Sequence, residues 1–236
     1  MAFEKPCGVA ADFRFKEGMT KSEIIPRLLD PGIIAILRAD TSEKLVSVVE
    51  ALMEGGITAA EVTMTTPNAL QVITEVTARF GGKVLMGVGS VLDPETCRAA
   101  ILAGAEFVVT PVTKPEVIRL ANRYGKPIVS GAFTPTEALL GYESGADFIK
   151  LFPADQVGPA YVRNMLAPLP MLQIMPTGGV TPEIVGDYLR AGCVGFGAGS
   201  TLVLKDAMKR GDYAAITRRA VEFVVAVKEA KKGLAE

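Results

Sequence analysis

Residues 143–153 have the sequence ESGADFIKLFP, in which the end of a helical pattern and a glycine precede a strand-length apolar run. The same order occurs in three other segments, MEGGITAAEVT (53–63), LAGAEFVVTP (102–111) and RAGCVGFGAGS (190–200). A glycine at this place suits the left-handed conformation that ends many helices. Successive segments are far enough apart for two strand–helix units each. The repeat therefore favours a closed (β/α)8 barrel over an open doubly wound sheet.

Short apolar runs alternate with helical patterns along the rest of the chain, as repeated strand–helix units require. Eight strands are predicted, at Ile33–Leu37, Ala59–Thr65, Val84–Gly87, Phe107–Thr110, Pro127–Ser130, Asp147–Phe152, Leu172–Pro176 and Val194–Gly197. Prolines are predicted in the first turn of the intervening helices, at Pro67, Pro94, Pro115, Pro135, Pro159 and Pro182. We expect an α/β protein with a (β/α)8 TIM-barrel fold, a short N-terminal helix at Thr20–Leu29 and a final amphipathic helix near Tyr213–Lys231. Residues 20–236 are expected to form a single domain after a lead-in of residues 1–19.

The composition agrees with this fold class and excludes several functions. Of the 236 residues, 49% are hydrophobic but only 6% are aromatic, which is typical of the aliphatic core between a parallel sheet and its helices. The formal net charge of −1 gives no electrostatic basis for binding nucleic acid or an anionic membrane. The chain contains no His, which excludes His-based triads and nearly all usual catalytic zinc sites.

The cysteines and the hydropathy indicate the cellular compartment. Cys7, Cys97 and Cys193 are odd in number and widely spaced, so we expect no disulfide framework and a reducing cytoplasm. No apolar run reaches the roughly 18 residues that a membrane-spanning helix needs. The amino terminus lacks the apolar stretch of a secretory signal.

Lys150 is the strongest candidate for a catalytic residue. It lies on the predicted sixth strand within FIKLFPA, with apolar residues on both sides. A lysine on a covered strand loses hydration, which disfavours the ammonium and leaves more of the neutral amine that attacks a ketone. The alternative is a structural lysine whose ammonium reaches water from a strand end, as we expect for Lys83 and Lys126 at the opposite rim.

Glu61 and Arg38 are the charged residues expected near Lys150. Glu61 lies on the second predicted strand, and a buried carboxylate is rare unless it is paired or catalytic. It could relay protons as a general acid and base, or form a structural ion pair with Arg38 or Lys150. Arg38 ends the first predicted strand, where it could bind the carboxylate of a keto acid or form a rim salt bridge with Asp40 or Glu61.

Two glycine-containing segments, PTGG (176–179) and GAGS (197–200), end the last two predicted strands. Small residues there leave backbone N–H groups free to bind a phosphate or carboxylate, and barrels commonly bind phosphate at these two strands. Tight turns are the alternative explanation. The candidate residues for anion binding are Gly178, Gly179, Gly199 and Ser200.

Taken together, these segments resemble the family of 2-keto-3-deoxy-6-phosphogluconate (KDPG) and 4-hydroxy-2-oxoglutarate (KHG) aldolases. The matching segments, in family order from about residue 20 to the end, are AILRA (35–39), EVTMTTP (61–67), GVGSVLDP (87–94), FVVTP (107–111), FIKLFPAD (148–155), PTGGVTP (176–182) and GAGSTLV (197–203). The resemblance implies an α/β barrel, a homotrimer, and no metal or organic cofactor. It also implies that Lys150 forms the Schiff base and that Glu61 relays protons.

The resemblance assigns the substrate contacts less uniformly. One branch of the family binds the pyruvate carboxylate through an arginine where this chain has Thr65, and the other uses the arginine that corresponds to Arg38. The remaining residues expected to contact the substrate are Thr63, Gly89, Pro111, Phe152, Thr177, Gly178, Gly179, Gly199 and Ser200.

Three alternatives to KDPG or KHG cleavage stay open at this point. A 2-keto-3-deoxy-6-phosphogalactonate aldolase would keep the same chemistry, although Thr177 in PTGG favours the gluconate type because it can hydrogen-bond a substrate hydroxyl. A sugar-phosphate isomerase or epimerase would share PTGG and GAGS but would not need Lys150. A non-catalytic barrel scaffold would need neither Lys150 nor Glu61.

Overall fold

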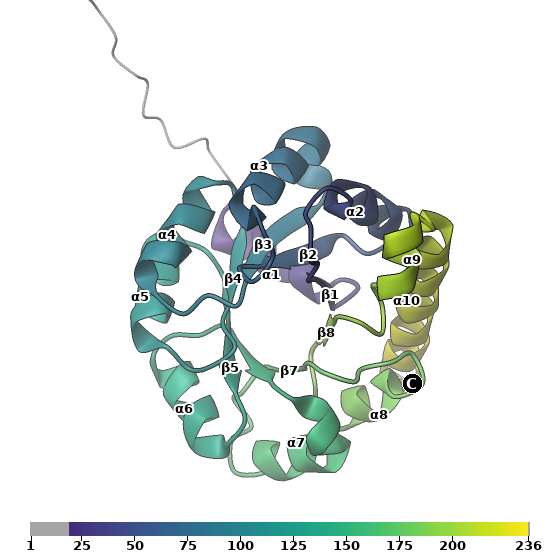
Figure 1. Cartoon of the computed structure of the whole chain (residues 1–236). Helices are drawn as coiled ribbons and strands as arrows, with labels where there is room; N and C mark the ends of the chain where they lie inside the picture. Colours follow the sequence, from purple (N-terminus) through teal and green to yellow (C-terminus); the bar gives the residue numbers. More distant parts are fainter. Residues whose placement is uncertain (1–18, 236) are drawn as a thin grey trace, which may run out of the picture.

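The structure, a computed structural model, describes residues 19–235. Eight parallel strands form one sheet in which β1 to β7 pair in chain order and β1 also pairs with β8. An isolated bridge between Thr177 and Gly197 joins β7 to β8, so the sheet closes into a barrel (Figure 1). The strands are β1 (Ile33–Leu37), β2 (Ala59–Thr63), β3 (Leu85–Gly89), β4 (Phe107–Val109), β5 (Ile128–Ala132), β6 (Phe148–Leu151), β7 (Ile174–Pro176) and β8 (Phe196–Ala198).

Helices surround the barrel, and their apolar faces pack against the outward-facing strand residues (Figure 1). They are α2 (Leu45–Glu54), α3 (Ala69–Phe80), α4 (Pro94–Leu102), α5 (Pro115–Arg123), α6 (Pro135–Glu143), α7 (Gly158–Leu166), α8 (Val185–Arg190), α9 (Lys205–Arg210) and α10 (Tyr213–Ala235), with 3-10 turns η1 (Gly81–Lys83) and η2 (Ala154–Gln156). Within residues 19–235, none of the helices combines the length and apolar character needed to cross a bilayer.

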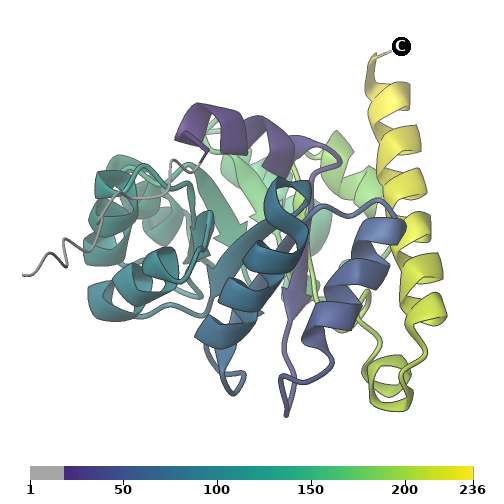
Figure 2. The same cartoon turned by 90° about the horizontal axis from the view of Figure 1, so that it is seen from above.

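Helix α1 (Lys21–Leu29) covers the amino-terminal mouth of the barrel (Figure 2). Its Ile24 and Leu28 are buried in the same apolar cluster as the inward-facing strand residues near this mouth, which include Leu85 and Phe107. The ammonium of Lys231 on α10 donates hydrogen bonds to the carbonyls of Leu29 and Pro31, at 2.7 and 3.0 Å. Because this mouth is filled, the polar residues at the carboxyl ends of the strands are the candidates for chemistry.

The eight predicted strands and the TIM-barrel fold are confirmed, and no strand end differs from its prediction by more than two residues. The repeat glycines Gly56, Gly104, Gly145 and Gly192 all have positive φ, between 87° and 110°, as a left-handed helix end requires. The N-terminal helix is confirmed, while residues 1–18 of the lead-in lie outside the described residues. Pro94, Pro115 and Pro135 open their helices as predicted, and Pro159 is the second residue of α7.

The predictions for Pro67 and Pro182 were wrong. Helix α3 begins at Ala69 and α8 at Val185, so both prolines lie in the preceding turns. Before α3, the amide of Thr66 donates to the Thr63 carbonyl, and before α8 the amide of Ile184 donates to the Thr181 carbonyl. Because Pro67 and Pro182 take part in these turns, they do not lie in the first turn of the helices that follow.

Candidate active site

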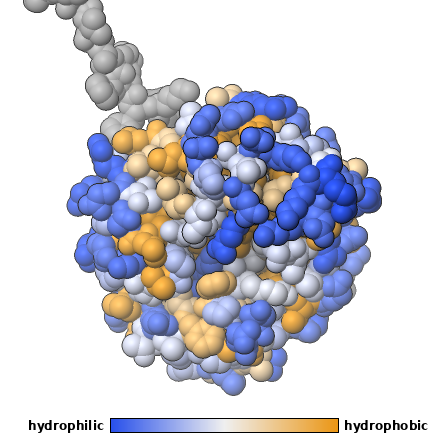
Figure 3. Space-filling view, in the orientation of Figure 1, coloured by the Kyte–Doolittle hydropathy of each residue, from blue (hydrophilic) through white to orange (hydrophobic). Residues whose placement is uncertain are grey.

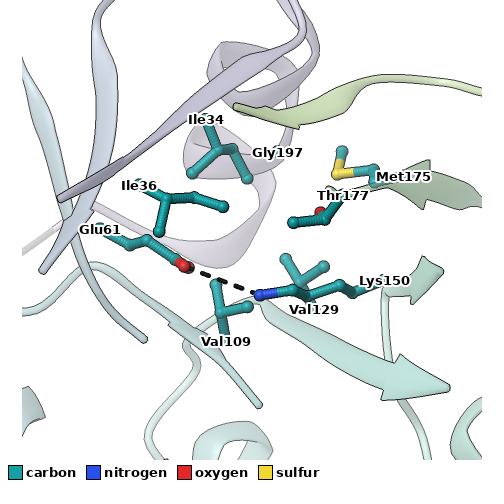
Figure 4. A pocket seen from close by; sticks show the side chains of 9 residues that line it. All are labelled: Ile34, Ile36, Glu61, Val109, Val129, Lys150, Met175, Thr177 and Gly197. Carbon is teal, nitrogen blue, oxygen red and sulfur yellow. Dashed lines mark ion pairs between the residues drawn. The ribbon is translucent and has the colours of Figure 1, made fainter. Parts of the chain in front are cut away.

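Lys150 on β6 and Glu61 on β2 meet inside the barrel (Figure 4). The Lys150 ammonium Nζ lies 3.8 Å from the Glu61 carboxylate Oε1. Only 8% of Lys150 and 1% of Glu61 are exposed, so neither side chain extends into bulk water. Of the two partners expected for Glu61, the structure places Lys150 beside it.

The other side chains around this pair are almost all apolar (Figure 4). They come from β1, β4, β5, β7 and β8, and the one further polar residue is Thr177, which is 5% exposed. The apolar ones were not predicted from the sequence, although the alternation of inward and outward residues along each strand could have identified them. They are Ile34, Ile36, Val109, Val129, Met175 and Gly197.

The Glu61 carboxylate is buried without a hydrogen bond to either oxygen in the described part of the chain. Burial raises the pKa of this carboxyl, and the nearby positive charges of Lys150 and Arg38 oppose the shift in part. A carboxyl with a raised pKa keeps its proton at a higher pH than a solvent-exposed glutamate does. This property suits general acid–base catalysis.

The Lys150 ammonium also faces the ring of Phe152, whose centroid is 5.3 Å from Nζ. Phe152 follows β6 and is 39% exposed, so its ring is partly open to solvent beside the amine. The face of an aromatic ring attracts a cation. The same contact can stabilise a protonated imine formed on the lysine.

Arg38 is exposed at the end of β1. Among the described residues it forms no ion pair with Asp40 or Glu61, so the rim salt bridges considered from the sequence are not formed. Within residues 19–235 its guanidinium has no ion-pair partner, so it is available to bind an anion at the mouth. The charge still acts on the buried site, because it partly opposes the rise in the pKa of Glu61 that burial causes.

Thr63 and Thr65 differ in exposure. Thr63 is buried, and its hydroxyl lies 3.0 Å from the Thr65 hydroxyl, 3.3 Å from the Thr66 hydroxyl and 3.4 Å from the Leu37 carbonyl. Thr65 is exposed at the rim. Both lie on the Arg38 side of the mouth, since β1 and β2 are neighbours.

The two glycine-containing loops lie side by side at the mouth. The Thr201 hydroxyl donates a 2.6 Å hydrogen bond to the Val180 carbonyl, which links the loop after β8 to the loop after β7. Gly178 and Gly179 have φ values of 99° and 66°, so glycine is needed for this backbone path. Within residues 19–235, the amides of Gly178, Gly179 and Ser200 donate to no protein acceptor, and they remain available to an anion.

Pro111 and Gly131 pack closely at the ends of β4 and β5. A Cβ atom on Gly131 would lie 2.2 Å from the Pro111 carbonyl carbon, so Pro111 crosses directly over the glycine. Gly131 is also the register partner of Lys150. Pro111 therefore borders the site on the β4 side.

No group of three His, Cys, Asp or Glu residues that could bind a metal ion is found among residues 19–235.

Comparison with known proteins gives concordant matches. The model of the KDPG and KHG aldolase family matches residues 24–219. A 2-dehydro-3-deoxy-6-phosphogalactonate aldolase from Escherichia coli K12 is 37% identical over 84% of this chain and 95% of its own length. A 2-dehydro-3-deoxy-phosphogluconate aldolase from Pseudomonas aeruginosa is 35% identical over 79% of this chain and 84% of its own length.

A solved structure extends this likeness to three dimensions. The KDPG aldolase of Legionella pneumophila, with pyruvate captured as a covalent carbinolamine intermediate, is 26% identical to this chain. It superimposes with a TM-score of 0.76 over 83% of this chain and 96% of its own.

Proposed function

We infer the function from one premise: the chain belongs to the KDPG and KHG aldolase family and is a carbon–carbon lyase. We propose that it cleaves 2-keto-3-deoxy-6-phosphogluconate to pyruvate and glyceraldehyde 3-phosphate, and also 4-hydroxy-2-oxoglutarate to pyruvate and glyoxylate. In this proposal residues 20–236 act as a single aldolase domain and Lys150 forms the Schiff base. The observation that carries the proposal is the buried Lys150–Glu61 pair, with Nζ and Oε1 3.8 Å apart.

The first half of the proposed reaction joins the keto acid to Lys150. Arg38 binds the carboxylate in the bidentate geometry that a guanidinium favours, and Thr63 and Pro111 border the pyruvate end. The neutral amine of Lys150 attacks the C2 carbonyl to form a carbinolamine. Glu61 gives a proton to the carbinolamine hydroxyl, water leaves, and a protonated imine remains.

The second half cleaves the C3–C4 bond. The protonated imine accepts the electron pair of that bond as a base removes the proton from the C4 hydroxyl, and the aldehyde product leaves. The resulting enamine takes a proton at C3, and water hydrolyses the imine to release pyruvate and the free amine. The backbone amides of Gly178, Gly179 and Ser200 are suited to the substrate phosphate, with Gly199 in the same loop. Thr65, Gly89, Phe152 and Thr177 complete the expected contacts.

Two other classes of function fit the site less well. A sugar-phosphate isomerase or epimerase would use the glycine-containing loops but has no use for an amine buried beside a carboxyl. A barrel that served only as a scaffold would not need to hold Glu61 without any hydrogen bond, because a buried carboxylate that accepts no hydrogen bond costs stability. A 2-keto-3-deoxy-6-phosphogalactonate aldolase is the alternative within the family.

Measuring kcat/KM for the gluconate, galactonate and hydroxyglutarate substrates side by side tests the substrate assignment. We expect the gluconate to give the highest value. Thr177→Val keeps the volume of the side chain but removes the hydroxyl, which lies against Gly197 in the pocket wall. It should lower kcat/KM for the gluconate about tenfold, the worth of roughly one hydrogen bond. A galactonate preference in the unmodified enzyme, with no effect of Thr177→Val, would contradict the assignment.

We propose that the chain is a homotrimer that works in the cytoplasm. Large apolar side chains are exposed along the consecutive units from β3 to β6, namely Leu92, Val112, Leu140 and Phe152. Figure 3 shows hydrophobic patches on this side of the molecule, where α4, α5 and α6 lie in Figure 1. Exposed apolar surface of this kind often marks an interface between subunits. The free thiols of Cys97 and Cys193 suit a reducing compartment.

Sedimentation equilibrium tests the assembly. We expect a particle with three times the chain mass of 24.9 kDa. Val112→Asp should dissociate it, because a charge in an apolar interface loses its hydration. Val225→Asp, at the similarly exposed Val225 on the outer side of α10, is the matched control and should leave the assembly intact. A monomer in the unmodified protein would refute the proposed trimer.

A further inference from the structure

Gly89 ends β3 at the point where this strand faces the Glu61 carboxylate. In the pairing of β2 with β3, Glu61 lies opposite Gly87, and Thr63 lies opposite Gly89. A Cβ atom added to Gly89 would lie 2.7 Å from Oε1 and 2.8 Å from Cδ of Glu61. Nonbonded atoms normally approach to about 3.5–4.0 Å. A methyl group at Gly89 and the carboxylate therefore cannot both keep these positions.

The backbone gives no other reason for a glycine at this position. Gly89 is not among the described glycines with positive φ, so other residues can adopt its conformation. Gly87, which also faces inward on β3, has a different neighbour: a Cβ atom there would lie 2.4 Å from the Phe107 ring. Gly87 thus makes room for a core aromatic ring, whereas Gly89 makes room for the carboxylate of Glu61.

The position of the Glu61 carboxylate depends strongly on the residues packed around it. Neither of its oxygens accepts a hydrogen bond within the described chain, so no donor fixes its orientation. Its position is therefore set by its attraction to the Lys150 ammonium, 3.8 Å away, and by the shape of the walls around it. Gly89 forms the wall nearest to Oε1 on the β3 side.

We propose that Gly89 is a positioning residue for catalysis: its missing side chain keeps open the space from which Glu61 exchanges protons with the adduct on Lys150. This inference rests on the proposed roles of Lys150 and Glu61. It gives a second role to Gly89, which is also expected to contact the substrate. In this second role Gly89 acts through Glu61.

Gly89→Ala is the direct test. The added methyl group should displace the carboxylate by about 1 Å, and a misplacement of that size can lower kcat about 10²-fold. KM should change much less, because Arg38 and the phosphate-binding loops are not altered. A Gly89→Ala enzyme with nearly unchanged kcat would overturn the proposal.

A double-mutant cycle with Glu61→Asp separates positioning from general damage. Aspartate is one methylene shorter, so its carboxylate leaves the space that the new methyl group needs. In the Glu61→Asp background, Gly89→Ala should lower kcat about threefold or less, because the two changes are coupled. Equal fold-losses in both backgrounds would overturn the proposal.

Melting temperatures of the four proteins give a second readout that does not depend on activity. If Gly89→Ala lowers stability, Glu61→Asp should restore it in the double variant, and a loss that Glu61→Asp does not restore would also overturn the proposal. Failure of the proposed function is distinguishable, because the unmodified enzyme would then form no pyruvate adduct. An active unmodified enzyme with additive effects refutes the role of Gly89 alone.

Discussion

Lys150→Ala is expected to lower kcat for aldol cleavage by about 10⁴-fold or more, because no other group can form the imine that accepts the electrons of the C3–C4 bond. The lysine lies on β6 with its ammonium 3.8 Å from Glu61 and faces Phe152 at the mouth of the barrel. Alanine removes the nucleophile but leaves Arg38 and the phosphate-binding loops unchanged. Substrate binding, measured by calorimetry on the inactive variant, should weaken far less than turnover.

Two controls distinguish the loss of the amine from the loss of a charge or of stability. Lys150→Arg keeps a positive charge beside Glu61 but cannot form the imine, so it should be as inactive as Lys150→Ala. Lys126→Ala removes a lysine at the opposite rim, where its ammonium pairs with Glu106 at 2.6 Å, and should keep most of the activity. If Lys150→Ala or Lys150→Arg retained more than about a tenth of the unmodified kcat, Lys150 would not be the Schiff-base residue.

Glu61→Gln is expected to lower kcat by about 10²–10⁴-fold, the usual worth of a general acid–base residue. Glutamine fills the same space between Gly89 and Lys150 but cannot take up or release a proton. The imine with pyruvate should still form, only more slowly, because Lys150 is intact. A Glu61→Gln enzyme with unchanged rates of imine formation and cleavage would show that Glu61 has only a structural role.

The same substitution should change how stability depends on pH. Burial raises the pKa of the Glu61 carboxyl above its ordinary value of 4.5, so the folded protein holds a proton that the unfolded chain releases. The contribution of Glu61 to folding is therefore most favourable below pH 4.5 and is lost as the pH rises through the raised pKa. Denaturant unfolding across this range should show a smaller fall in stability with pH for Glu61→Gln. An identical fall in both proteins would contradict the assigned direction of the shift.

Much of the fold could be predicted because local patterns and global topology agree. The eight strands could be predicted from strand-length apolar runs, and the helix ends from the four repeat glycines. The N-terminal helix at Thr20–Leu29 could also be predicted from residue type. The place of α1 could not be predicted, since its burial depends on Ile24 and Leu28 meeting the inward-facing residues of the barrel. The environment of Lys126 also depends on a tertiary contact. Its ammonium pairs with Glu106, whereas the sequence suggested an ammonium that extends to water.

The residues of the candidate site could be predicted from the sequence, but their arrangement in space could not. Lys150 and Glu61 were identified from their apolar flanks, but their 3.8 Å separation depends on how β2 and β6 face each other across the barrel. The sequence left open whether Arg38 pairs with Glu61, and only the geometry shows that it does not. The function of Gly89 was beyond prediction, because the register of β2 with β3 places the carboxylate against it.

Reduction of the pyruvate imine by borohydride, followed by mass spectrometry of the digested protein, tests the identity of the nucleophile most directly. Pyruvate and borohydride together should add one carboxyethyl group to the side-chain amine at position 150, and neither reagent alone should do so. An unmodified position 150, or an adduct on a different lysine, would contradict the account.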